Sequence, residues 1–206
     1  MPRKKGYKGP SVFMLLTFGI ITVCYFLAHV FDRSELIDLA LKIDNSKDFN
    51  WLTQEGHIYR YFTHSFLHVN FLHYFMNMMN FILIWGILRK YKVNESAIIV
   101  VYCSSVVLGG FGHMLYNVNN PTSTFLMGAS GGVFGQLGML VSYYIKSRDL
   151  NSLKLTCMID LPLNVIVPIL VPRVSWMAHL IGFLIGLIVG LLVIQKKSIR
   201  ELFITN

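Results

Sequence analysis

Six apolar stretches follow one another along the chain and are separated by polar connections. They cover residues 11–30, 71–88, 96–114, 125–144, 155–171 and 176–194. A helix that spans a bilayer needs about 20 predominantly apolar residues. The pattern therefore predicts an all-α polytopic membrane protein with six transmembrane helices, which form a single domain over residues 1–206.

Two of these stretches have features of their own. The first follows a basic segment, as in a secretory signal peptide, but it is longer than the about 7–15 apolar residues of such a signal. No Ala-x-Ala cleavage site follows it, and we expect it to be a retained helix. The fifth contains Pro162 and Pro168, which free backbone carbonyls inside a helix. We expect that helix to be short, irregular or mobile.

A long polar segment, residues 31–69, separates the first two apolar stretches. Within it, residues 35–43 have apolar side chains at helical spacing with charges between them. This pattern predicts a short amphipathic helix at the membrane surface. Loops of this length are usually functional or carry structure of their own.

Lysine and arginine residues are concentrated in alternate connections. The N-terminal segment, the connections after the second and fourth stretches, and the C-terminal tail are basic, whereas the connection between the fifth and sixth carries only Arg173. Basic segments remain on the cytoplasmic side of a membrane. The distribution therefore predicts cytoplasmic termini and an outer location for residues 31–69. We expect a bacterial cell membrane, that is, an inner or plasma membrane.

The composition supports a membrane protein. Hydrophobic residues make up 54% of the chain and charged residues 14%, whereas about 25% of residues are charged in soluble domains. A net charge of +8 would suggest a nucleic-acid partner for a soluble protein, but here the basic residues lie between apolar stretches and indicate topology. The three cysteines lie within apolar stretches without metal-binding spacing, so we expect no metal, no cofactor and no nucleic acid.

One serine, Ser130, lies among four glycines in the sequence Gly-Ala-Ser-Gly-Gly-Val-Phe-Gly at residues 128–135. Small residues such as Gly128 and Gly131 allow helix backbones to approach closely. Taken alone, the stretch favours such packing. The alternative is that Ser130 is a nucleophile, which requires a partner base and an oxyanion site.

The expected sixth helix contains His179, followed by Gly182 and Gly186. A histidine inside a spanning helix is a functional candidate, because its burial costs free energy; the alternative is a neutral imidazole hydrogen-bonded between helices. In the expected helices, Ser130 lies about five residues and His179 about three residues below the outer surface. Two glycine faces packed together would bring these side chains within hydrogen-bond reach.

His73 and Asn77 are four residues apart and share one helix face. Both side chains carry N–H donors that could stabilise an oxyanion. Taken alone, however, the pair favours an interhelical hydrogen bond, which is common for Asn in membranes. We place His64 and His68 near the membrane interface, and His113 has no evident partner. No acidic residue lies near the outer ends of the relevant helices, so a serine–histidine dyad is expected rather than a triad.

Assembled in order, these motifs resemble the rhomboid family of intramembrane serine proteases. The resemblance extends over about residues 1–197 and rests on four segments: residues 59–68, His73-x-x-x-Asn77, Gly-Ala-Ser-Gly at 128–131, and His179 followed by Gly182 and Gly186. The resemblance implies a six-helix rhomboid-like bundle. It also implies roles for five residues: Ser130 as nucleophile, His179 as general base, His73 and Asn77 as oxyanion donors, and Phe134 as a ring stacked near the base.

The implied activity is that of an endopeptidase that cleaves transmembrane protein substrates near the outer membrane boundary, without metal or cofactor. One departure is Tyr59-Arg60, where the family often has Trp-Arg, and the role of this loop stays open. The main alternative is a catalytically inactive rhomboid-like protein that binds membrane helices. A small transporter would require paired charges within the helices, and the sequence has none at the helix centres.

Overall fold

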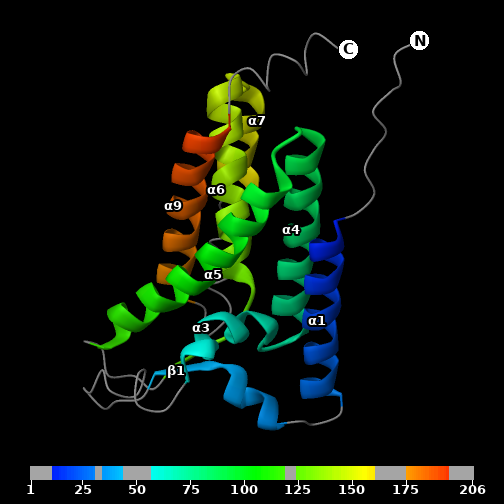
Figure 1. Ribbon diagram of the computed structural model, residues 1–206, viewed down its shortest axis with the longest axis vertical. Coiled ribbons are helices and arrows are strands. Elements are labelled where there is room, and N and C mark those ends of the chain that lie inside the picture. The colour runs from blue at the N-terminus through cyan, green and yellow to red at the C-terminus, as the bar shows by residue number, and fades with distance from the viewer. Residues whose placement is uncertain (1–10, 31–33, 44–56, 119–123, 161–174, 195–206) are drawn as a thin grey trace.

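The computed structural model describes residues 11–30, 34–43, 57–118, 124–160 and 175–194. Five helices of 18 residues or more lie in this part of the chain: α1 Val12–His29, α4 Phe71–Lys90, α5 Glu95–Val118, α6 Ser130–Ser147 and α9 Trp176–Val193. They form a bundle in which α5 crosses obliquely between the other helices (Figure 1). The protein is mostly helical, as predicted.

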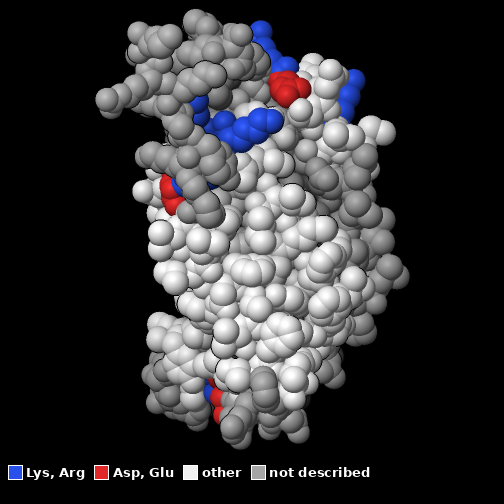
Figure 2. Space-filling view, turned by 90° about the vertical axis from the view of Figure 1, so that its right-hand side faces the viewer, with Lys and Arg blue, Asp and Glu red and all other residues white. Residues whose placement is uncertain are grey.

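Four of these helices are long and apolar enough to cross a membrane: α1, α4, residues Glu95–Asn117 of α5, and α9. Figure 2 shows the same property on one face, where a broad band without charged side chains separates charged residues near the two ends. The chain is therefore a multi-pass membrane protein. The expected fifth helix, residues 155–171, lies mostly outside the described residues. Its described part, residues 155–160, consists of the last residue of α7, Leu150–Leu155, and a π-helical turn, Thr156–Asp160.

Helix α6 occupies the centre of the bundle. Every residue from Gly131 to Tyr144 is buried, and the helix packs most extensively on α9 and then on α5. Helix α6 is as long as α1 and α9, but it is not apolar enough to be one of the four helices that could cross a membrane by length and composition. Its composition explains this difference, since polar residues such as the fully buried Gln136 lie within it.

Glycines set the distance between α6 and α9. A Cβ atom added at Gly182 would overlap the carbonyl oxygen of Gly131, and one added at Gly186 would overlap that of Gly135. The two parallel helices therefore touch backbone to backbone, which is possible only with small residues. At the far end, Lys146 Nζ donates to the carbonyl of Ile194 at 2.5 Å.

The predicted helix at residues 125–144 is wrong at its beginning. Helix α6 begins at Ser130, and Thr124–Leu126 instead forms strand β2, which pairs antiparallel with strand β1, Leu41–Ile43. The fold is therefore not purely helical. Leu41 and Leu126 face each other in the ladder and both lie in a small buried core, so burial favours the extended form of these short segments.

The amphipathic helix expected at residues 35–43 is also wrong. The chain forms a 3-10 helix, η1 Ser34–Leu39, and then enters strand β1. Backbone pairing with β2 competes with the helical pattern there. The rest of the described loop comprises η2 His57–Tyr59, α3 Arg60–Thr63 and η3 His64–Phe66.

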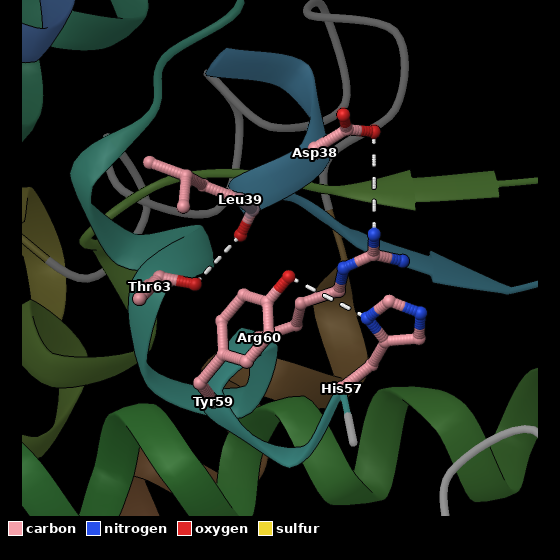
Figure 3. Close-up of polar contacts among 6 residues, drawn as sticks. All are labelled: Asp38, Leu39, His57, Tyr59, Arg60 and Thr63. Atoms are coloured by element: carbon pink, nitrogen blue, oxygen red, sulfur yellow. Dashed lines mark hydrogen bonds and ion pairs between the residues drawn. The ribbon is translucent and has the colours of Figure 1, made fainter. Parts of the chain in front are cut away.

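Polar contacts tie η1 to α3 (Figure 3). Thr63 Oγ1 donates to the carbonyl of Leu39 at 2.9 Å, and the Arg60 guanidinium lies 4.0 Å from the carboxylate of Asp38. The Tyr59 hydroxyl lies 3.4 Å from His57 Nδ1. The Tyr59-Arg60 pair thus makes its contacts within the loop itself, beside the two-stranded sheet.

Candidate active site

Ser130 is the first residue of α6, whereas the sequence pattern placed it about five residues into a helix. Ala129 occupies the N-cap and makes no side-chain capping bond. The first backbone N–H groups of a helix have no partner within the helix, and this end carries partial positive charge. The hydroxyl of Ser130 therefore lies beside backbone donors that are available to an anion.

Gly128 shapes the approach to this helix. Its φ of +125° is a conformation that other residues rarely adopt. A Cβ atom at this position would also lie 2.7 Å from the His73 ring and 3.6 Å from Asn77 Nδ2. Glycine is required here for both reasons, and its small size brings the backbone before Ser130 against the His73 and Asn77 side chains.

The Ser130 hydroxyl and the His179 imidazole meet across the α6–α9 contact. His179 Nε2 lies 2.8 Å from Ser130 Oγ, at hydrogen-bond distance. His179 is the fourth residue of α9 and is buried. This distance fits a serine and a base that accepts its proton.

Phe134, one helical turn after Ser130, packs flat against the imidazole. The ring centroids of Phe134 and His179 are 4.2 Å apart and the planes are inclined by 8°. A stacked neighbour restricts rotation of the imidazole about its long axis. The plane of the ring is therefore fixed by packing, and Nε2 is held toward Ser130.

His73 and Asn77 present donors without protein partners. Both residues are buried, and within the described part of the chain neither ring nitrogen of His73 nor Asn77 Nδ2 has a hydrogen-bond partner. A buried donor without a partner costs free energy and is uncommon in native proteins. Both side chains lie against Gly128, two residues before Ser130.

His64 and His68, expected near the membrane interface, are both buried within the protein. The backbone N–H of Ala129 points to His68 Nε2 at 3.5 Å, and the His68 ring lies edge-on to His73 with centroids 5.1 Å apart. Burial lowers the pKa of His68 well below its ordinary value. A neutral His68 can accept this bond, which supports the residue before Ser130. In the sequence, the signal for this role of His68 is its position at the end of the segment 59–68, directly before α4.

His113 also differs from expectation, because it has partners. Its Nδ1 lies 2.6 Å from the hydroxyl of Ser175, and Asn117 Nδ2 lies 3.2 Å from the same nitrogen. Ser175 is the N-cap of α9. Among the described residues, no group of three or more His, Cys, Asp or Glu side chains could hold a metal ion.

The fold and these polar residues define a multi-pass helical membrane protein with a buried polar site at one end of its central helix. The family model named Rhomboid domain matches residues 55–196. The chain belongs to the rhomboid family.

Relatives occur in a bacterium and a plant. The chain is 27% identical over 159 residues to the Bacillus subtilis protein named "Putative rhomboid protease YdcA", which covers 76% of this chain and 78% of that protein. It is 30% identical over 149 residues to RHOMBOID-like protein 1 of Arabidopsis thaliana, covering 70% of this chain and 37% of the plant protein. RHOMBOID-like protein 5 of the same plant is 30% identical over 137 residues, covering 64% and 43%.

Proposed function

We propose that this protein is an intramembrane serine endopeptidase that cleaves transmembrane protein substrates near the outer membrane boundary. The observation that carries the proposal is the 2.8 Å contact between Ser130 Oγ and His179 Nε2 at the glycine-lined contact of α6 and α9. Membership of the rhomboid family and the bacterial relative named as a rhomboid protease support it.

The first half of the reaction forms an acyl-enzyme. Ser130 Oγ attacks the scissile carbonyl carbon while its proton passes to His179 Nε2. The resulting oxyanion accepts hydrogen bonds from the backbone N–H of Ser130 and from His73 and Asn77. The tetrahedral intermediate then breaks its C–N bond, and the imidazolium of His179 gives its proton to the leaving amine.

The second half releases the acid product. His179 takes a proton from a water molecule, the resulting nucleophile attacks the ester carbonyl, and the same donors stabilise the second oxyanion. Collapse of this intermediate returns the proton to Ser130 Oγ. Phe134 keeps the imidazole plane fixed through both proton transfers, and no metal or cofactor takes part.

The proposed topology has six helices in one domain over residues 1–206, with both termini in the cytoplasm of a bacterial cell. Ser130 lies at one end of α6, while Lys146 lies in the last turn at the other end, and Arg89 and Lys90 close α4. Basic residues favour the cytoplasmic side, so the site belongs to the outer side. Partners are the lipid bilayer and substrate helices, which enter beside α4 and the segment of residues 155–171.

The test compares cleavage of a type I single-span substrate by detergent-purified wild type, Ser130→Ala and His179→Ala. The substrate carries small residues near its outer membrane boundary. We expect cleavage by the wild type and none by either variant, with a fluorophosphonate probe labelling Ser130. Cleavage that survives Ser130→Ala would disprove the assigned nucleophile. A wild type that neither cleaves nor labels would instead favour a protein that only binds membrane helices.

A further inference from the structure

A row of residues along α5 holds the beginning of α9. The residues are four apart and therefore share a face. Ser105 Oγ donates to the carbonyl of Gly182 at 3.3 Å. One turn on, Gly109 has no side chain, and a Cβ there would lie 3.0 Å from the carbonyl oxygen of Ala178. One further turn on, His113 Nδ1 lies 2.6 Å from Ser175 Oγ.

The last of these contacts reaches the cap of the helix. Ser175 Oγ accepts the backbone N–H of Ala178 at 3.1 Å, the bond expected of an N-cap serine. Because the oxygen is used as an acceptor, the hydroxyl proton of Ser175 is free to be donated to His113 Nδ1. The cap is therefore itself bound by a side chain from another helix.

The neighbours of His113 define its protonation state. Asn117 Nδ2, a donor, lies 3.2 Å from His113 Nδ1 and 2.8 Å from the His113 carbonyl oxygen. We assign the hydroxyl proton of Ser175 and one amide hydrogen of Asn117 to Nδ1, which makes this nitrogen an acceptor. The ring proton is then on Nε2, a buried atom without a hydrogen-bond partner in the described part of the chain. All three residues are buried. His113 is therefore a neutral imidazole that accepts a hydrogen bond from the hydroxyl of Ser175, the N-cap of α9.

This N-cap lies one turn from the proposed general base. Ser175 precedes His179 by four residues, and His179 N–H donates to the carbonyl of Ser175 at 3.3 Å. The intervening Ala178 is buried in the small core with Leu41 and Leu126. The first turn of a helix is normally its least restrained part, yet here it must hold an imidazole within hydrogen-bond distance of Ser130.

We propose that His113 is a positioning residue for the reaction proposed above: acting through Ser175, it fixes the first turn of α9 and so places His179 against Ser130. This role of His113 rests on the proposed function, and the contact between Ser130 and His179 does not by itself require it. A misplacement of about 1 Å in a catalytic group can lower the rate about a hundredfold. A variant that loosens the N-cap of α9 should therefore have a lower kcat.

The experiment uses the protein in detergent, four single variants and the double variant His113→Phe/Ser175→Ala. His113→Phe keeps a ring but removes the acceptor, and Ser175→Ala removes the hydroxyl. His113→Asn restores an acceptor, because the Asn Oδ1 occupies the position of Nδ1. Ser11→Ala is the matched control: Ser11 caps α1 by accepting the N–H of Met14 at 3.2 Å and is equally buried, but α1 carries no residue of the proposed site.

We expect His113→Phe and Ser175→Ala each to lower kcat, and the fluorophosphonate labelling rate of Ser130, about tenfold, with KM within about twofold of wild type. The double variant should be no slower than either single variant, since both break one interaction. His113→Asn should recover most of the loss, and Ser11→Ala should retain wild-type kcat.

The inference is overturned if the wild type cleaves substrate while His113→Phe and Ser175→Ala keep the kcat and labelling rate of Ser11→Ala. It is also overturned if His113→Asn is as slow as His113→Phe, or if the two losses multiply. Should His113→Phe not fold, Ser175→Ala with rescue by Ser175→Thr decides the question alone. A wild type without cleavage or labelling refutes the proposed function instead.

Discussion

Gly186 of α9 lies directly against the carbonyl oxygen of Gly135 on α6, with no room for a Cβ atom between them. Replacing Gly186 with alanine should force the two helices apart. Overpacking of this kind costs about 1–3 kcal/mol, and here it also separates Ser130 from His179. We expect Gly186→Ala to lower the thermal unfolding midpoint in detergent and to reduce cleavage strongly.

Gly86 provides the matched control, because a Cβ at this exposed position of α4 would meet nothing within 4 Å. Alanine is favoured over glycine within a helix by about 0.5–1 kcal/mol. Gly86→Ala should therefore keep or raise the unfolding midpoint and retain activity. Equal midpoints for the two variants would contradict the backbone contact between α6 and α9.

Phe134 should act through the orientation of the His179 imidazole. Phe134→Tyr keeps a ring that can stack, whereas Phe134→Leu keeps apolar volume but removes the stacking. An aromatic pair contributes about 0.5–1.5 kcal/mol beyond burial, so Phe134→Leu should lower kcat about two- to tenfold. Steady-state kinetics of the two variants would check this, and equal losses in both would show that ring stacking is not the cause.

Asn77 is expected to contribute through Nδ2 to the oxyanion rather than to the fold. Removal of one such donor costs about a hundred- to a thousandfold in kcat. Asn77→Ala should therefore lose activity with little change in unfolding midpoint. Asn80→Ala is the comparison on the same helix, since Asn80 Nδ2 donates to the carbonyl of Met76 at 2.9 Å. Similar kcat values for both variants would exclude the assigned role of Asn77.

His64 makes stability depend on pH. Burial, with a smaller contribution from nearby His113, lowers the pKa of His64 to about 4 from 6.5, against opposing backbone contacts with Val106 and Tyr61. Between pH 6.5 and pH 4, His64 is protonated in the unfolded chain but stays neutral in the folded protein. The free energy of unfolding is therefore expected to fall as the pH falls toward 4. At 1.36 kcal/mol per unit of pKa, the loss from this residue is about 3 kcal/mol.

The corresponding measurement is the unfolding midpoint of His64→Phe and wild type between pH 7 and pH 4. The variant should lose less stability on acidification. Tyr61→Phe is the control, because it removes a buried hydroxyl that contacts Met114 Sδ at 2.8 Å and its raised pKa keeps it neutral throughout this range. Parallel pH curves for His64→Phe and Tyr61→Phe would refute the role of His64.

Much of the helical scaffold is predictable from the sequence, because apolar stretches of spanning length report directly on burial in lipid. The second stretch, 71–88, corresponds to α4, Phe71–Lys90, and the sixth, 176–194, to α9, Trp176–Val193. The approach of Ser130 to His179 also follows from glycine spacing on two helices. Both patterns depend only on residues close together in the sequence, so they can be recognised before the packing of the helices is known.

The two strands are not predictable in the same way. Thr124–Leu126 is as apolar as the helix that follows, and the positive φ of Gly128, which ends the extended segment, leaves no signal in hydropathy. Strand β1 depends on a partner more than 80 residues away, at Leu41↔Leu126. The links from His113 to Ser175 and from Ala129 to His68 likewise join distant segments, so they appear only once the chain is folded.

The burial of α6 has a consequence for biosynthesis. A helix enclosed by its neighbours from Gly131 to Tyr144 presents little surface to lipid, and α6 lacks the hydropathy of the other spans. Insertion of a single segment depends on its own apolar content, so of the five long helices described, α6 is the least able to leave the translocation machinery alone. We expect it to enter the bilayer together with α5 or α9, which makes completion of the reactive site a late step in the maturation of each new chain.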